Sequence, residues 1–67
     1  MDKLYFEDAV KAIEEAGLNP EVTPETETDY GSIRYKLYNP DRKIYVEFLM
    51  LFDKGIFVDQ YVEVYNA

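Results

Sequence analysis

The chain contains no cysteine, no histidine and no tryptophan, and Ser32 is its only serine. Without histidine or cysteine there is no imidazole base, no thiolate nucleophile and neither of the side chains that commonly hold zinc, copper or iron. Ser32 lacks the basic partner that would activate it as a nucleophile. The sequence therefore predicts a non-enzymatic protein with no catalytic residues, no bound metal and no cofactor.

Long apolar runs are also missing. The longest charge-free apolar stretch is the five residues Phe48–Phe52, whereas a membrane-spanning helix needs about 20. The first residues, Met1–Lys3, lack the basic and apolar regions of a secretory signal. We expect a soluble, cytoplasmic protein that does not contact membranes.

The composition is that of a folded domain. Hydrophobic residues make up 48% and aromatic residues 16% of the 67 positions, which is well above what disordered chains contain. A chain of this length can form only one domain, which we place at residues 1–67.

The first segment has the periodicity of an amphipathic helix. Between Leu4 and Ala16 the apolar side chains recur three and four residues apart. Asp2 is a suitable N-cap, and Gly17 stands where a left-handed residue ends a helix.

From residue 32 onward the apolar pattern has a period of two, which indicates strands. The expected strands are Ser32–Tyr38, Lys43–Phe52 and Ile56–Tyr65, with turns at Asn39–Arg42 and at the three-residue loop Asp53–Gly55. Segment Glu21–Asp29 alternates acids and threonines around a proline, which suits a weak edge strand.

Pairing the strands outward from both turns tests whether they share one apolar face. This register places Leu37 opposite Ile44, Phe52 opposite Ile56 and Met50 opposite Val58, all on the face that one helix would cover. The predicted fold is α+β, with one N-terminal helix packed on a small antiparallel sheet, a three-stranded meander with a possible weak edge strand.

The opposite face of this predicted sheet is unusually aromatic and apolar. Leu49, Leu51, Phe57 and Tyr61 would be left in water there, and the last strand would be a long free edge. We take these four residues as candidates for self-association, which predicts a possible homodimer.

The net charge of −7 lies entirely in the first 29 residues, since residues 30–67 hold five acids and five bases. The candidate partner-binding residues are Glu7, Asp8, Glu14, Glu15, Glu21, Glu25, Glu27 and Asp29. If the second half of this set is extended, Glu25, Glu27 and Asp29 project to one side about 6.6 to 7 Å apart, close to the spacing of phosphates along a nucleic-acid strand. Such a row of carboxylates could imitate a row of phosphates.

Other interpretations of the acids have less support. The chain lacks the spacing of a calcium-binding loop, and it is too short to build a cleft around a catalytic carboxyl pair. The acids could also serve only to keep a small domain soluble.

Three hypotheses about function follow. The first is an acidic decoy that occupies the DNA-binding surface of a basic protein. The second is a structural or regulatory module that binds its partner through the aromatic sheet face or the last strand. The third is binding of single-stranded nucleic acid by the tyrosines and cations between residues 34 and 45, which the charge of −7 opposes.

In its size, its acidic helix, its ETETD run and its lack of histidine and cysteine, the chain resembles small phage-encoded host-takeover proteins that mimic DNA. Within that group it is most similar to phage inhibitors of the histone-like nucleoid protein HU. The resemblance covers the overall profile of the chain and includes no shared motif. It implies a basic DNA-binding host protein as the partner, displacement of DNA as the mechanism, and action in the host cytoplasm without direct contact to nucleic acid.

Overall fold

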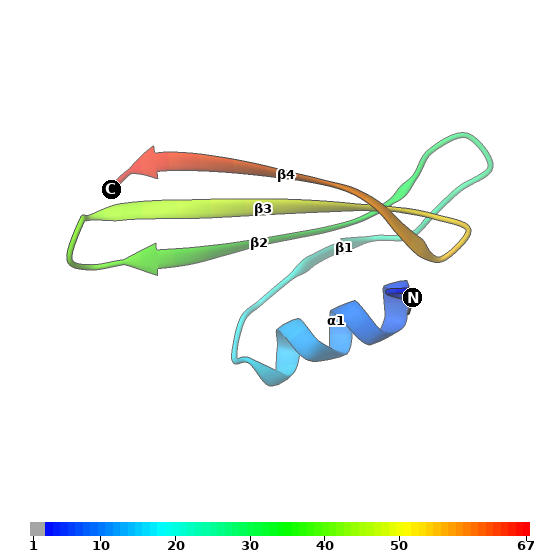
Figure 1. Ribbon diagram of the computed structural model, residues 1–67, viewed down its shortest axis with the longest axis horizontal. Helices are drawn as coiled ribbons and strands as arrows, with labels where there is room; N and C mark the ends of the chain where they lie inside the picture. Colours follow the sequence, from blue (N-terminus) through cyan, green and yellow to red (C-terminus); the bar gives the residue numbers. More distant parts are fainter. Residues whose placement is uncertain (1–2) are drawn as a thin grey trace.

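The computed structural model describes residues 3–67 and contains one helix and one sheet. The elements, in chain order, are α1 (Phe6–Glu15), β1 (Glu21–Thr23), β2 (Gly31–Asn39), β3 (Ile44–Asp53) and β4 (Ile56–Asn66). The four strands form an antiparallel sheet in the order β1-β2-β3-β4, and α1 lies on one side of it (Figure 1). The predicted α+β fold is confirmed.

Helix α1 is held at its start by strand-like backbone pairing. Its N-cap is Tyr5, which makes no side-chain capping bond, and Asp2, the predicted cap, lies outside the described residues. The Phe6 N–H donates to the Gly55 carbonyl at 2.9 Å, and the Phe57 N–H donates to the Leu4 carbonyl at 2.9 Å. These two bonds attach the helix start to the turn before β4 and to the start of β4 itself.

The end of α1 confirms the prediction at Gly17. This glycine has a φ of 84°, and its N–H donates to the Glu14 carbonyl at 3.0 Å. The Leu18 N–H reaches back to the Ile13 carbonyl at 3.3 Å. This pair of bonds is the Schellman arrangement, in which a left-handed residue satisfies the last carbonyls of a helix.

The segment predicted as an edge strand at Glu21–Asp29 is a strand only over its first three residues. Glu21 pairs with Arg34 and Thr23 pairs with Ser32, after which the chain leaves the sheet. A proline at position 24 has no N–H to donate, which explains why pairing stops there.

The hairpin of β2 and β3 is paired two residues away from the predicted register. Leu37 lies opposite Val46, and Asn39, not Leu37, lies opposite Ile44. The strands extend to Asn39, whose Oδ1 accepts hydrogen bonds from the N–H groups of Asp41 at 3.0 Å and Arg42 at 3.2 Å. This side chain stabilises a longer loop, and a shift of two positions leaves every side chain on its predicted face.

The register of β3 and β4 also differs from the prediction. Met50 lies opposite Gln60 instead of Val58, and Phe52 lies opposite Phe57 instead of Ile56. Two features cause the change. The turn at Lys54 and Gly55 holds two residues instead of three, which places Phe57 opposite Phe52, and a bulge between Leu51 and Phe52 shifts the rest of β4 by one more residue. The predicted position of Phe57 on the outer face is therefore wrong, and Phe57 packs against the core on the helix side.

The core lies between α1 and the end of the sheet next to the turn between β3 and β4. Its buried residues are Ala9, Ile13, Ile33, Met50 and Phe52. The Phe52 ring contacts the Phe6 ring at a centroid distance of 5.2 Å and the Phe57 ring, edge to face, at 5.9 Å. This turn end of the sheet is the packed half of the molecule.

The expectation that one helix covers the whole apolar face is wrong. A helix of 10 residues is about 15 Å long, whereas the 11 residues of β4 extend over about 36 Å. At the end of the sheet far from this turn, the exposed fractions are 42% for Leu37, 54% for Val62 and 62% for Val64. Half of the apolar face therefore lies in water.

Candidate acidic interaction surface

The outward side of α1 carries four exposed carboxylates. Glu7, Asp8, Glu14 and Glu15 are all exposed, on the side of the helix away from the buried Ala9 and Ile13. Lys11 is the only base within the helix. Among residues 3–67 the only ion pair joins Lys36 to Glu47 on the sheet, so the four helix carboxylates are not neutralised by a salt bridge in the part described.

The position of the acids at the end of α1 is unfavourable for stability. The last turn holds Glu14 and Glu15 and contains no base. Backbone carbonyls give this end of a helix a partial negative charge, so each carboxylate there costs a few tenths of a kcal/mol. Stability of the helix therefore does not account for these two residues, whereas a role in solubility or binding would.

Glu25 has a structural role that the sequence did not reveal. Its carboxylate accepts hydrogen bonds from the backbone N–H groups of Lys54 at 3.0 Å and Gly55 at 3.2 Å. Lys54 and Gly55 both have positive φ, 53° and 76°, so the turn is a two-residue loop of the I′ kind and not the predicted three-residue loop. We call this contact the Glu25 clamp.

A close backbone approach at Gly31 accompanies the Glu25 clamp. A Cβ atom at Gly31 would lie 3.4 Å from both the Cβ and the backbone nitrogen of Glu25. The loop between β1 and β2 thus folds back to within van der Waals distance of the start of β2. The signal available in the sequence was a lone glycine at the start of a strand, which indicates a close approach of backbone.

The predicted row of three carboxylates does not exist. The loop bends at residues 27–29, where the Thr26 N–H donates to the Asp29 carbonyl at 3.0 Å and the Asp29 N–H donates to Thr26 Oγ1 at 3.0 Å. Glu27 and Asp29 are exposed on this folded loop, while Glu25 faces the turn at Lys54 and Gly55. The even 6.6 to 7 Å spacing of an extended segment is therefore absent.

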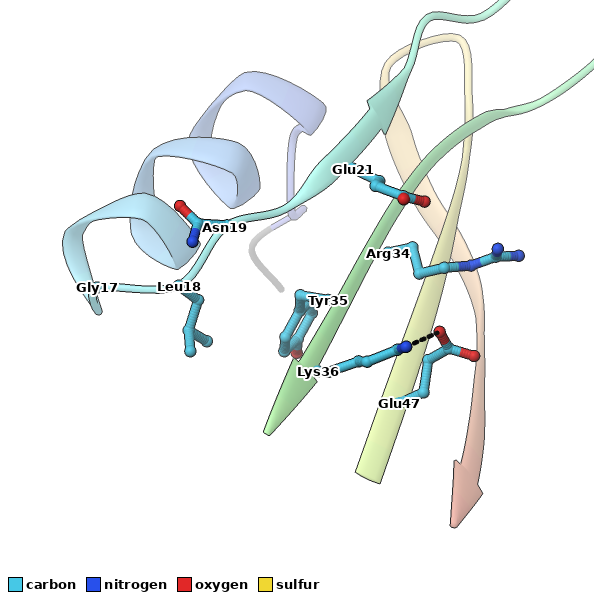
Figure 2. A pocket seen from close by; sticks show the side chains of 8 residues that line it. All are labelled: Gly17, Leu18, Asn19, Glu21, Arg34, Tyr35, Lys36 and Glu47. Carbon is cyan, nitrogen blue, oxygen red and sulfur yellow. Dashed lines mark ion pairs between the residues drawn. The ribbon is translucent and has the colours of Figure 1, made fainter. Parts of the chain in front are cut away.

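Glu21 lies beside basic residues of the sheet. It pairs with Arg34 across β1 and β2, and both residues line an open hollow of about 470 Å³ at the sheet edge (Figure 2). The hollow also contains Lys36, whose Nζ lies 4.0 Å from a carboxylate oxygen of Glu47. Glu21 therefore lies in a region of mixed charge.

A second hollow brings three of the predicted acids together. Glu7, Asp8 and Glu25 line an open depression of about 500 Å³ beside the start of α1. Its remaining lining residues are Tyr5, Phe6 and Gly55. Within residues 3–67 no group of three or more acidic side chains lies close enough to hold a metal ion. The acids that the structure groups together are therefore Glu7, Asp8 and Glu25, with Glu14 and Glu15 farther along the same helix.

The outer face of the sheet, on the side away from α1, carries tyrosines and one polar cluster. Tyr38, Tyr45, Tyr61 and Tyr65 are each at least 40% exposed, while Leu49 and Leu51 are half-buried. Of the four self-association candidates, Leu49, Leu51 and Tyr61 lie on this face, and Phe57 does not.

Tyr65 is at the centre of the polar cluster. Its hydroxyl hydrogen bonds to carboxylate oxygens of Glu63 at 2.5 Å and Glu47 at 2.9 Å. These bonds, and the negative charge beside them, raise the pKa of the Tyr65 phenol, and a hydrogen bond with Asp59 raises the pKa of Tyr61 in the same way. In the predicted register, in which Phe52 lies opposite Ile56, Tyr65 falls opposite Lys43. The sequence therefore did not reveal this cluster.

Within residues 3–67 no helix is long and apolar enough to span a membrane. Comparison of the chain with known protein families, with curated proteins and with solved structures found no match. The resemblance to phage DNA mimics stays a prediction.

Proposed function

We propose that the protein is a non-enzymatic inhibitor that acts as an acidic DNA mimic in the cytoplasm of a host cell. It occupies the DNA-binding surface of a basic host protein, such as a nucleoid protein. The binding surface consists of the exposed carboxylates of α1 together with the acidic depression at its start. The residues that carry the contact are Glu7, Asp8, Glu14 and Glu15, with Glu27 and Asp29 on the adjacent loop.

The observation that supports this proposal most is the placement of Glu14 and Glu15. Both carboxylates are exposed, neither is in a salt bridge within the described residues, and both lie at the helix end that disfavours negative charge. A basic partner would compensate this charge on binding, and electrostatic attraction would speed the association.

The test is a competition for DNA. A fluorescein-labelled duplex is bound to a purified histone-like nucleoid protein, and the anisotropy is followed as the acidic protein is added. We expect the duplex to be released, with a midpoint that rises at least about tenfold between 50 and 200 mM salt, because screening weakens attraction between exposed charges.

A matched pair of variants identifies the surface. The double substitution Glu14→Gln with Glu15→Gln removes two charges from α1, and Asp41→Asn with Asp53→Asn removes one charge from the β2–β3 loop and one from the end of β3. We expect the first variant to compete at least about threefold more weakly and the second to compete like the parent chain. Equal weakening by both variants would show that net charge alone matters, and no release of DNA by the parent chain would disprove the proposal for that target.

The alternative function is that of a structural or regulatory interaction module. The observation in its favour is the uncovered apolar half of the sheet, where Leu37, Val62 and Val64 are exposed. Binding through this surface would change little with salt, so the same salt series separates the two functions. In this alternative the helix acids serve solubility only.

A further inference from the structure

Strand β4 has a long outer edge that no described segment covers. It is the last strand in the sheet order, and among residues 3–67 its only neighbour on the outer side is the short stretch at Leu4 and Tyr5, which pairs with Ile56 and Phe57. The remaining residues, Val58–Asn66, have no strand beside them within residues 3–67. We call these nine residues the free edge.

The free edge has little of the usual protection against pairing: it has two carboxylates, Asp59 and Glu63, and a bulge only at its first residue, Val58. It contains no proline and no lysine, and the register of β4 with β3 is regular from Asp59 to Asn66. Proteins that keep an edge strand single use such residues, bulges or a covering loop. An edge of this length is therefore suited to accept another strand.

We propose that the free edge pairs with the free edge of a second copy of this chain, antiparallel, about a twofold axis at Val62. The twofold axis between two antiparallel neighbours is perpendicular to the sheet, so each face of one copy continues as the same face of the second copy. The axis lies midway between two copies of the same residue, which therefore face each other. Val62 is the middle residue of the free edge, and this position pairs all nine residues of each copy. The two sheets join into one sheet of eight strands.

The charges of the free edge select the same register. With the axis at Val62, Asp59 lies opposite Tyr65 of the second copy, and Glu63 lies opposite Tyr61. Each carboxylate thus meets a tyrosine, and no two like charges oppose each other.

The neighbouring registers are less favourable. An axis at Tyr61 places Asp59 opposite Glu63, and an axis at Glu63 places that carboxylate opposite its own copy, both of which are repulsive pairs. An axis at Gln60 requires residues 54 to 57, whose outer side the Leu4 segment already occupies. An axis at Val64 pairs only residues 62–66.

The joined sheet has a consequence for the exposed apolar surface. Both copies keep α1 on the same side of the sheet, and the uncovered end of each sheet lies beside the helix-covered end of the other. Val62 of one copy lies next to Val62 of the second. Both side chains are on the apolar face, where Val62 is exposed in the single chain. This arrangement does not depend on the function proposed above.

Cysteine crosslinking tests the register. The chain has no cysteine, so a single substitution gives a unique thiol. In Val62→Cys the two thiols lie directly opposite each other, with Cβ atoms about 5 Å apart, which a small adjustment brings into disulfide range. In the control Val64→Cys, which starts from a similarly exposed valine, the two thiols are about 13 Å apart along the strands.

We expect Val62→Cys to form the disulfide-linked dimer at least about tenfold faster than Val64→Cys under the same mild oxidant. Equal rates for the two variants, or a faster reaction of Val64→Cys, would overturn the register and with it the proposal.

Sedimentation measures the association without a crosslink. We expect the parent chain to dimerise below about 0.5 mM and the dimer to strengthen with salt, because screening reduces the repulsion between two chains of charge −7. Val62→Lys places two ammonium groups side by side at the axis and should weaken the dimer at least about tenfold, whereas Leu37→Lys adds the same charge on β2 and should leave it unchanged. Circular dichroism confirms that both variants are folded. A parent chain that stays monomeric, or equal weakening by both variants, would contradict the proposal.

Discussion

The two ends of the sheet are stabilised in different ways. At the turn end, next to Lys54 and Gly55, α1 buries Ile33 and Phe52 completely, and the Glu25 clamp closes the turn. At the far end, next to the loop at residues 40–43, apolar side chains such as Val64 remain exposed. The side-chain hydrogen bonds there are those of Tyr65 with Glu47 and Glu63. The comparison shows that an apolar strand pattern indicates which face is inside, and the length of the covering helix decides how much of that face is buried.

The largest expected difference between the two ends is in the cost of losing a side chain. Phe52→Ala should lower the free energy of unfolding by about 3 to 5 kcal/mol, because it removes a fully buried ring from the core. Val64→Ala at the far end should cost less than about 1 kcal/mol, since Val64 is 62% exposed. Urea unfolding followed by circular dichroism gives both values. Similar losses at the two positions would show that the far end is covered in solution.

A smaller effect separates two acids that are two residues apart. Glu25→Ala should lower the free energy of unfolding by about 1 to 2 kcal/mol, because two backbone N–H groups lose a charged acceptor. Glu27→Ala is the matched control and should change stability by less than about 0.5 kcal/mol, as expected for an exposed loop side chain. The same urea titration measures both. If the two variants were equally stable, the Glu25 clamp would contribute nothing.

The smallest effect concerns the pH dependence of the far end. The pKa of Tyr65 is raised above the ordinary value of 10.0 by its hydrogen bonds to Glu63 and Glu47. The raised pKa means that these bonds stabilise the folded state below about pH 10 and lose their effect as the pH rises toward the folded pKa. Absorbance at 295 nm should show one tyrosine that ionises after most of the others, and Tyr65→Phe should remove that late step. A titration in which the late step persists in the variant would assign it to another residue, with Tyr61 the first candidate.

The repeating patterns in the sequence were sufficient to predict the fold class. Spacings of three and four residues located the helix, Gly17 located its end, and alternation located the three long strands. The register was wrong because it depended on three local details: the side chain of Asn39 in one loop, and a two-residue turn and a bulge beside Phe52 in the other hairpin. None of these details has a periodic signature, and the two-residue turn placed Phe57 on the opposite face.

The sequence identified the acidic residues of the candidate site but did not predict how they are arranged in space. The helix periodicity correctly placed Glu7, Asp8, Glu14 and Glu15 on the exposed side of α1. The roles of Glu21 and Glu25 were not visible, because both depend on partners far along the chain, Arg34 in one case and the turn at Lys54 and Gly55 in the other. Charge alone does not distinguish a carboxylate that binds backbone from one that faces water.

The bond between the Leu4 carbonyl and the Phe57 N–H also bears on the order in which the chain folds. The two hairpins are local and can close early, whereas α1 docks against residues that are translated some fifty positions after it. During synthesis the apolar side of the helix therefore remains exposed until β4 has left the ribosome. The exposed acids on its other side favour hydration of the nascent segment during that interval.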